Sequence, residues 1–83
     1  METKYKVVGL DEDRPTLEEM QEFVGGRIEL VYVDNGHFVV NEEGLLDGLP
    51  INLEASLEFW GLVNWDTAPA LVGDVIFIEG GLH

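Results

Sequence analysis

The sequence predicts an α+β fold in which a small antiparallel sheet with a central β-hairpin carries two short helices. Residues 24–44 contain two alternating runs on either side of Asn35-Gly36, a pair typical of tight hairpin turns. Apolar residues recur at helical spacing in two other stretches, and residues 75–78 form the continuous apolar run of an interior strand. The resulting order, β-α-β-β-α-β, is that of the ferredoxin-like fold. The plainer expectation is a small antiparallel sheet with both helices on one face.

The first strand and the first helix are expected in the N-terminal third. Residues 4–10 read as a short strand, and two lysines among them indicate an edge guarded by positive charge. The stretch 16–19 fits a capping box, in which the Thr16 hydroxyl meets the amide of Glu19 and the Glu19 carboxylate reaches back. Gly25-Gly26 should end this helix, with the first glycine in the left-handed conformation.

The hairpin is expected to pair residues 27–33 with residues 37–42. If Asn35 and Gly36 are the two turn residues, both must tolerate positive φ, as a type I′ turn requires. The expected pairs are Val33–Phe38, Tyr32–Val39, Val31–Val40, Leu30–Asn41 and Glu29–Glu42, the last being a like-charge pair.

A second helix is expected over residues 53–60, with Asn52 as its N-cap and Gly61 as its end. One face of this helix carries Leu53, Leu57 and Trp60. Residues 62–70 read as a loop or extended segment, and residues 71–79 contain the last strand. The chain is therefore expected to form one domain, whose core is thin because so few residues bury only about 60% of their unfolded surface.

The composition excludes several classes of site. There is no cysteine, so neither a disulfide framework nor a thiolate zinc site is available. No signal peptide is visible, and no run approaches the ~20 apolar residues of a membrane helix. These observations favour a cytoplasmic protein that does not enter a membrane.

Charge is the dominant feature of the composition. Seventeen Asp and Glu residues face four Lys and Arg residues, which gives a net charge of −13. Such a surface should repel nucleic acid and anionic membranes, so any macromolecular partner is expected to be basic. The alternative is that the charge serves only solubility.

The candidate binding residues fall into two acidic segments and one aromatic pair. The first segment is the loop and helix face that carry Asp11, Glu12, Asp13, Glu18, Glu19 and Glu22. The second segment carries Glu42, Glu43 and Asp47. The aromatic pair, Trp60 and Trp65, lies close to Phe59, and so small a core cannot readily bury every aromatic ring, so an exposed apolar patch is expected there. The alternative is that both tryptophans cap the core.

The sequence offers no convincing catalytic or metal site. Glu42 and Glu43 are neighbours on one strand and point to opposite faces, so they do not form a simple acid–base pair. Ser56 has no histidine near it in sequence, and His37 is expected to be exposed beside the hairpin turn. The acidic runs lack the spacing of a calcium-binding loop. We therefore expect no cofactor, no bound metal and no enzymatic activity.

Four fragments of the chain together resemble a family of small domains from bacteriophages and mobile elements whose function is unknown. The fragments are 24–29 (VGGRIE), 41–44 (NEEG), 49–55 (LPINLEA) and 72–75 (VGDV). The resemblance covers roughly residues 17–78 and implies a phage or mobile-element context. It implies no catalytic residue.

Two functions follow as hypotheses. The first is a non-enzymatic binding protein that docks on a basic surface of a host protein in the host cytoplasm, in its most specific form by imitating nucleic acid and occluding a nucleic-acid-binding groove. The second is a structural or self-associating module that forms a homodimer through the tryptophan patch or an exposed sheet edge.

Overall fold

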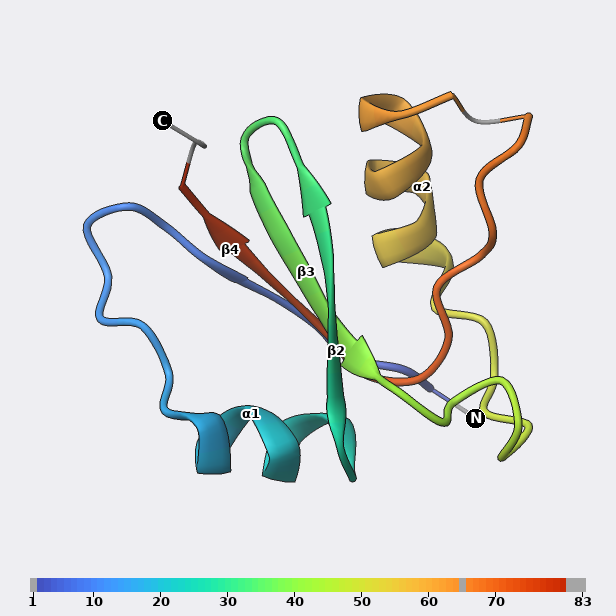
Figure 1. Cartoon of the computed structure of the whole chain (residues 1–83), viewed down its shortest axis with the longest axis horizontal. Coiled ribbons are helices and arrows are strands. Elements are labelled where there is room, and N and C mark those ends of the chain that lie inside the picture. The colour runs from blue at the N-terminus through green and yellow to red at the C-terminus, as the bar shows by residue number, and fades with distance from the viewer. Residues whose placement is uncertain (1, 65, 81–83) are drawn as a thin grey trace.

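The computed structural model describes residues 2–64 and 66–80 (Figure 1). It confirms the α+β class and the predicted order of elements. In chain order the elements are β1 (Tyr5–Val8), α1 (Leu17–Val24), β2 (Ile28–Val33), β3 (Gly36–Asn41), α2 (Leu53–Leu62) and β4 (Val75–Glu79).

The four strands form one sheet in the order β1-β4-β3-β2. Strands β2, β3 and β4 are antiparallel neighbours, as expected, but β1 pairs with β4 in parallel, so the sheet is mixed. The ferredoxin-like arrangement is not formed. Two strands, β4 and β3, separate β1 from β2, and α2 connects antiparallel neighbours, so neither helix belongs to a split β-α-β unit.

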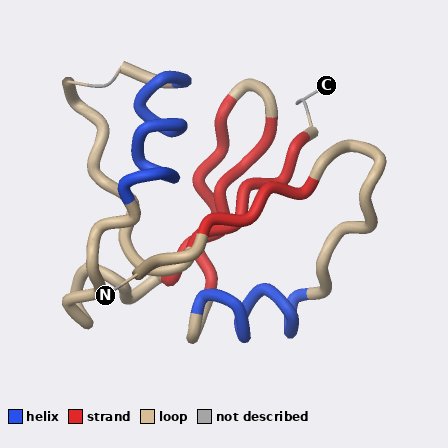
Figure 2. The backbone as a smooth tube through the Cα atoms, turned by 180° about the vertical axis from the view of Figure 1, so that it is seen from behind, coloured by secondary structure: helices blue, strands red, loops and turns tan. Residues whose placement is uncertain are grey.

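The two helices cover opposite faces of the sheet, which corrects the expectation that they share one face (Figures 1 and 2). On the α2 side, Phe38 and Phe77 pack with Phe59 of the helix. On the α1 side, Val39 and Ile76 pack with Val24. The reason is that β3 and β4 carry buried apolar side chains on both faces, and each face must be covered to remove them from water.

The hairpin forms in a different register from the one expected. Val33 pairs with Gly36, so the turn residues are Asp34 and Asn35, and neither of these two has positive φ. The turn is therefore not of type I′. A Cβ on Gly36 would lie 2.2 Å from the carbonyl oxygen of Ile78, so the glycine is needed where β3 approaches β4.

The register shift moves the pairing by two residues and keeps each side chain on its expected face. The expected like-charge pair does not form, because Glu29 lies opposite Val40. The main-chain amide of Glu42 instead donates to the carbonyl oxygen of Arg27 at 2.8 Å.

Helix α1 is built as its sequence predicts. The Glu19 amide donates to the Thr16 hydroxyl at 3.1 Å, and the Thr16 amide donates to the Glu19 carboxylate at 2.8 Å, which completes the capping box. Gly25 ends the helix with φ of 85°, a left-handed conformation.

Helix α2 begins after Asn52 as predicted but does not end at Gly61. It continues to Leu62, because Gly61 lies on an open surface and nothing there breaks the helical hydrogen bonds. Asn52 itself is 1% exposed and accepts a hydrogen bond from the Ala55 amide at 3.1 Å. Its amide group donates to the carbonyl oxygens of Lys4 and Gly73, both at 2.9 Å, and so joins α2 to the segments that lead into β1 and β4.

Candidate binding surfaces

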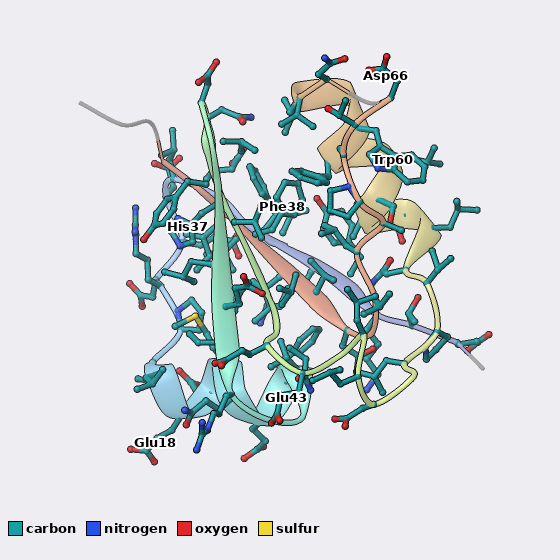
Figure 3. All side chains as sticks on the ribbon, turned by 45° about the vertical axis from the view of Figure 1, so that its right-hand side comes forward. Glu18, His37, Phe38, Glu43, Trp60 and Asp66 are labelled. Atoms are coloured by element: carbon teal, nitrogen blue, oxygen red, sulfur yellow. The ribbon has the colours of Figure 1, made fainter. Side chains whose placement is uncertain are left out.

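The predicted acidic residues all lie on the surface of the molecule. We call the following nine exposed residues the acidic surface: Asp11, Glu12, Asp13, Glu18, Glu19, Glu22, Glu42, Glu43 and Asp47. Figure 3 shows Glu18 of the first segment and Glu43 of the second at the same end of the molecule. The loop that carries the first three residues runs from the end of β1 to the start of α1 along one side of the fold (Figure 1).

A buried asparagine holds the second acidic segment beside the helix that carries part of the first. The side-chain amide of Asn41 donates to the carbonyl oxygen of Val24, the last residue of α1, at 3.1 Å. Its oxygen accepts from the main-chain amide of Glu43 at 2.8 Å. The loop with the second acidic segment therefore starts beside the C-terminal end of the helix that carries Glu18, Glu19 and Glu22.

Two members of the acidic surface also have structural roles. Glu12 accepts a hydrogen bond from the Gly9 amide at 2.8 Å. Glu19 closes the capping box, and the hydrogen bonds from the Thr16 backbone and then its side chain lower the pKa of the Glu19 carboxyl. Glu19 is therefore ionised at neutral pH, but its geometry is fixed by the helix.

Trp60 contributes less free surface than the sequence suggests. Trp60 is half-buried, packs against the core on the α2 side, and donates from its indole nitrogen to the carbonyl oxygen of Pro69 at 3.1 Å. Phe59 is buried in that core. Trp65 lies outside the described residues.

An exposed apolar stripe on α2 was missed by sequence reasoning. Ala55, Ser56 and Phe59 face the sheet, so Leu53 and Leu57 are left 60% and 58% exposed. The small side chains of Ala55 and Ser56 were the signal in the sequence that this face meets the sheet, since a helix that approaches a sheet closely presents small residues to it. Beside this stripe is an open groove of about 390 Å³, lined by Tyr5, Glu54, Leu57, Glu58, Gly61 and Leu62.

Tyr5 at the base of that groove has an altered acidity. Burial, and then the negative charges of Glu58 and Glu54, raise the pKa of the Tyr5 hydroxyl to about 12. The phenol is therefore neutral at physiological pH and does not act as a nucleophile or base there.

A second groove lies on the α2 side of the sheet, between the start of β2 and the chain at residues 69–72. We call it the β2 groove. It has a volume of about 270 Å³ and is lined by Glu29, Val31, Val40, Asn41, Glu42, Leu45, Pro69, Ala70, Leu71 and Val72. Its walls are mostly apolar, and its two ionisable groups are both carboxylates.

Ser56 and His37, the other side chains that could take part in chemistry, lie in buried or half-buried surroundings. The Ser56 hydroxyl is buried and exchanges hydrogen bonds with the backbone of Leu71, donating at 3.2 Å and accepting at 2.9 Å. His37 is half-buried, not exposed as expected, and burial followed by the charge of Arg14 lowers the pKa of its imidazole. Across residues 2–64 and 66–80, no group of three or more His, Asp or Glu side chains is placed to hold a metal ion.

The four sequence fragments meet in the structure and support one another. The Asn41 side chain bonds to Val24, and the Asn52 side chain bonds to Gly73. A Cβ on Gly44 would lie 2.8 Å from Val72, and one on Gly73 would lie 2.8 Å from Leu49. The fragments therefore position loops and helix ends in this fold.

These features define a small acidic α+β domain. Buried Asn41 fixes the loop after β3 to the end of α1, and buried Asn52 fixes the start of α2 to the segments before β1 and β4. The chain belongs to the DUF3846 family, a domain of unknown function, which it matches over residues 2–81. The predicted resemblance to a family without known function is confirmed at this level. No curated protein and no solved structure matches the chain significantly. No helix in the described part of the chain is long and apolar enough to cross a membrane.

Proposed function

We propose that this protein is a non-enzymatic acidic binding protein that docks on a basic surface of a host protein and occludes it. The observation that carries the proposal is the acidic surface: six carboxylates in residues 11–22 and three in residues 42–47, all exposed, in a chain of net charge −13. A partner rich in Lys and Arg would be attracted to this surface from a distance of about 10 Å at moderate salt.

The more specific form of the proposal is imitation of a nucleic acid. The longest dimension of the fold is 34 Å. Over that length one DNA strand carries about ten phosphates and a duplex carries about twenty. The nine carboxylates of the acidic surface correspond in number to a single strand, so the favoured target is a groove that tracks one phosphate backbone.

The four sequence fragments that resemble domains from phages and mobile elements support such a context for this chain. In that context the chain would act in the cytoplasm of a host cell, where nucleic-acid-binding proteins of the host are abundant. The mechanism would be competitive inhibition: the chain and the nucleic acid would exclude one another from the same basic groove.

The test is a comparison of two variants with equal charge changes. In the first, Asp11, Asp13, Glu18 and Glu22 are replaced by Asn or Gln, which spares the two carboxylates with structural roles. In the matched control, Asp34, Glu54, Glu58 and Asp66, which are also exposed, are replaced in the same way.

Each variant is used to retain proteins from a host lysate, and the retained proteins are eluted with a salt gradient and assayed for displacement of bound DNA or RNA. We expect the first variant to reduce recovery of a nucleic-acid-binding partner at least tenfold and the control to reduce it much less. Equal recovery with both variants, or a partner that keeps its nucleic acid, would contradict the proposal.

Self-association is a second candidate function, and the observation that favours it is the free outer edge of β2. In this case the chain would form a dimer by pairing β2 with the same strand of a second copy. Sedimentation velocity over a hundredfold range of concentration tests it, because a pairing equilibrium would shift the sedimentation coefficient as the chain is diluted.

A further inference from the structure

The two edges of the sheet are protected very differently. The strand order leaves β1 and β2 at the edges. The β1 edge has Lys6 within the strand and Lys4 directly before it, and lysine is a common protection against pairing with other chains. Strand β2 (IELVYV) has neither lysine nor proline, and its one charged residue is Glu29. The exposed Arg27 directly before the strand is a cation at this edge, on the same face as Glu29. The backbone groups on the outer side of β2 are therefore an open template for another strand.

The β2 groove lies directly beside this unprotected edge. Val31 of β2 and Leu45 of the following loop contribute apolar surface, while Glu29 and Glu42 contribute negative charge. On the opposite face of the same strand, Leu30 and Tyr32 are also exposed. A strand added at this edge would therefore meet apolar contacts on both faces and carboxylates on the α2 side.

We propose that the β2 edge binds an extended basic segment of a partner protein as a fifth strand of the sheet. The main chain of the segment pairs with residues 28–33, its Lys or Arg side chains lie on the α2 side near Glu29 and Glu42, and its apolar side chains lie on the opposite face against Leu30 and Tyr32. This inference rests on the proposed function, since it assumes a basic partner, and it adds the form in which that partner is recognised.

Charge distinguishes a basic segment from a second copy of this chain. In an antiparallel pairing of two copies centred on Leu30, the two Glu29 side chains would lie on the same face at diagonal positions, roughly 7–8 Å apart, whereas a pairing centred on Ile28 would place Arg27 of each copy opposite Glu29 of the other. Each copy also has a net charge of −13. Two copies therefore repel one another through their net charge in any register, while a basic segment is attracted, so the net charge favours the basic occupant at this edge.

The experiment uses the full chain labelled with ¹⁵N and a capped peptide of alternating Lys and Val. We expect peptide binding to shift the amide signals of residues 28–33 more than those of residues 11–22. A peptide N-methylated at every residue, which cannot donate backbone hydrogen bonds, should not bind, and an alternating Glu and Val peptide should not bind either.

Two exposed glutamates provide matched variants. We expect Glu29→Lys to weaken the Lys-Val peptide at least tenfold, and Glu58→Lys, an identical charge change on α2, to weaken it less than threefold. Glu29→Gln provides a milder change at the same position if the lysine variant loses its native amide spectrum.

The remaining outcomes separate this inference from the proposed function. Equal weakening by both lysine variants, with signal changes centred on residues 11–22, would overturn strand addition and leave the basic partner intact. Retention of the basic host partner without peptide binding would have the same meaning. Loss of all binding to basic ligands would overturn both proposals. A dimer in the absence of peptide, with amide signal changes centred on residues 28–33 as concentration rises, would assign the edge to a second copy instead.

Discussion

At the scale of single residues, one buried amide determines how the C-terminal half is arranged. Asn52 caps α2 with its oxygen and donates from its nitrogen to the carbonyl oxygens of Lys4 and Gly73. Its capping role follows from sequence, because Asn before an apolar helical pattern is a common N-cap. Its two other bonds join segments far apart in the chain, so only the structure reveals them.

Replacing Asn52 by Ala should destabilise the protein by about 2–4 kcal/mol. The lost cap accounts for about 1 kcal/mol, and the unpaired carbonyl oxygens account for the rest. Urea denaturation monitored by tryptophan fluorescence measures the effect. Asn64→Ala, an exposed asparagine in the loop after α2, is the control and should change the midpoint little. Equal midpoints for both variants would contradict the role assigned to Asn52.

His37 should contribute a pH-dependent term to stability. Burial, followed by the positive charge of Arg14, lowers the pKa of its imidazole below the usual 6.5 in the folded state. The unfolded chain therefore takes up the proton first, so this contribution is complete above pH 6.5 and is lost as pH falls toward the folded pKa.

The measurement is the free energy of unfolding at about pH 8 and about pH 5 for the wild type and for His37→Gln. The variant should lose less stability than the wild type over this interval. The difference between the two chains removes the background from the carboxylates, which titrate in both. Identical pH profiles would show that His37 has the same pKa folded and unfolded.

At the scale of the elements, helix α2 shows that the spacing of apolar residues does not specify which face of a helix meets the sheet. The sequence places Leu53, Leu57 and Trp60 on one face, and the structure leaves both leucines exposed while Ala55, Ser56 and Phe59 face the sheet. The hydrogen bonds between Ser56 and Leu71 fix the rotation of the helix about its axis and so determine which face meets the sheet. Those bonds join residues 15 apart, so hydrophobic spacing does not reveal them.

Gly61→Ala should stabilise the protein by about 0.5–1 kcal/mol. Gly61 lies inside α2 on an open surface, and alanine restricts the unfolded chain more than glycine does. Thermal unfolding followed by circular dichroism measures the change. Gly25→Ala is the paired comparison and should destabilise, because Gly25 has φ of 85° at the end of α1. A loss of stability in Gly61→Ala would restore the original prediction that the helix ends there.

At the scale of the whole molecule, repulsion among carboxylates opposes folding. A net charge of −13 on a fold with a radius of gyration of 12.0 Å places many like charges within a Debye length of each other. The unfolded chain separates them, so the compact state carries the larger cost. A basic partner would reduce this cost on binding, which links the charge to the proposed function.

Added salt should therefore stabilise the free protein. Between about 0.05 M and 0.5 M NaCl we expect a gain of order 1 kcal/mol, which corresponds to roughly 4–8 °C in Tm for a domain of this size. The variant with Asp11, Asp13, Glu18 and Glu22 neutralised should respond less. A Tm that does not change with salt would mean that the carboxylates are far enough apart not to interact.

The sequence by itself determined the α+β class, the order of the elements, both helix N-caps, the end of α1 and the interior position of β4. These features depend on neighbouring residues, through alternation, helical spacing and capping, and such information is local. The charge, and with it the expectation of a basic partner, also comes from composition alone.

Only the tertiary structure decided the parallel pairing of β1, the opposite placement of the helices, the register at Gly36 and the free edge of β2. Each depends on contacts between distant residues, such as Gly36 with Ile78 and Asn52 with Lys4. The physical reason is that both faces of β3 and β4 had to be covered, and local pattern does not specify which segment covers each face.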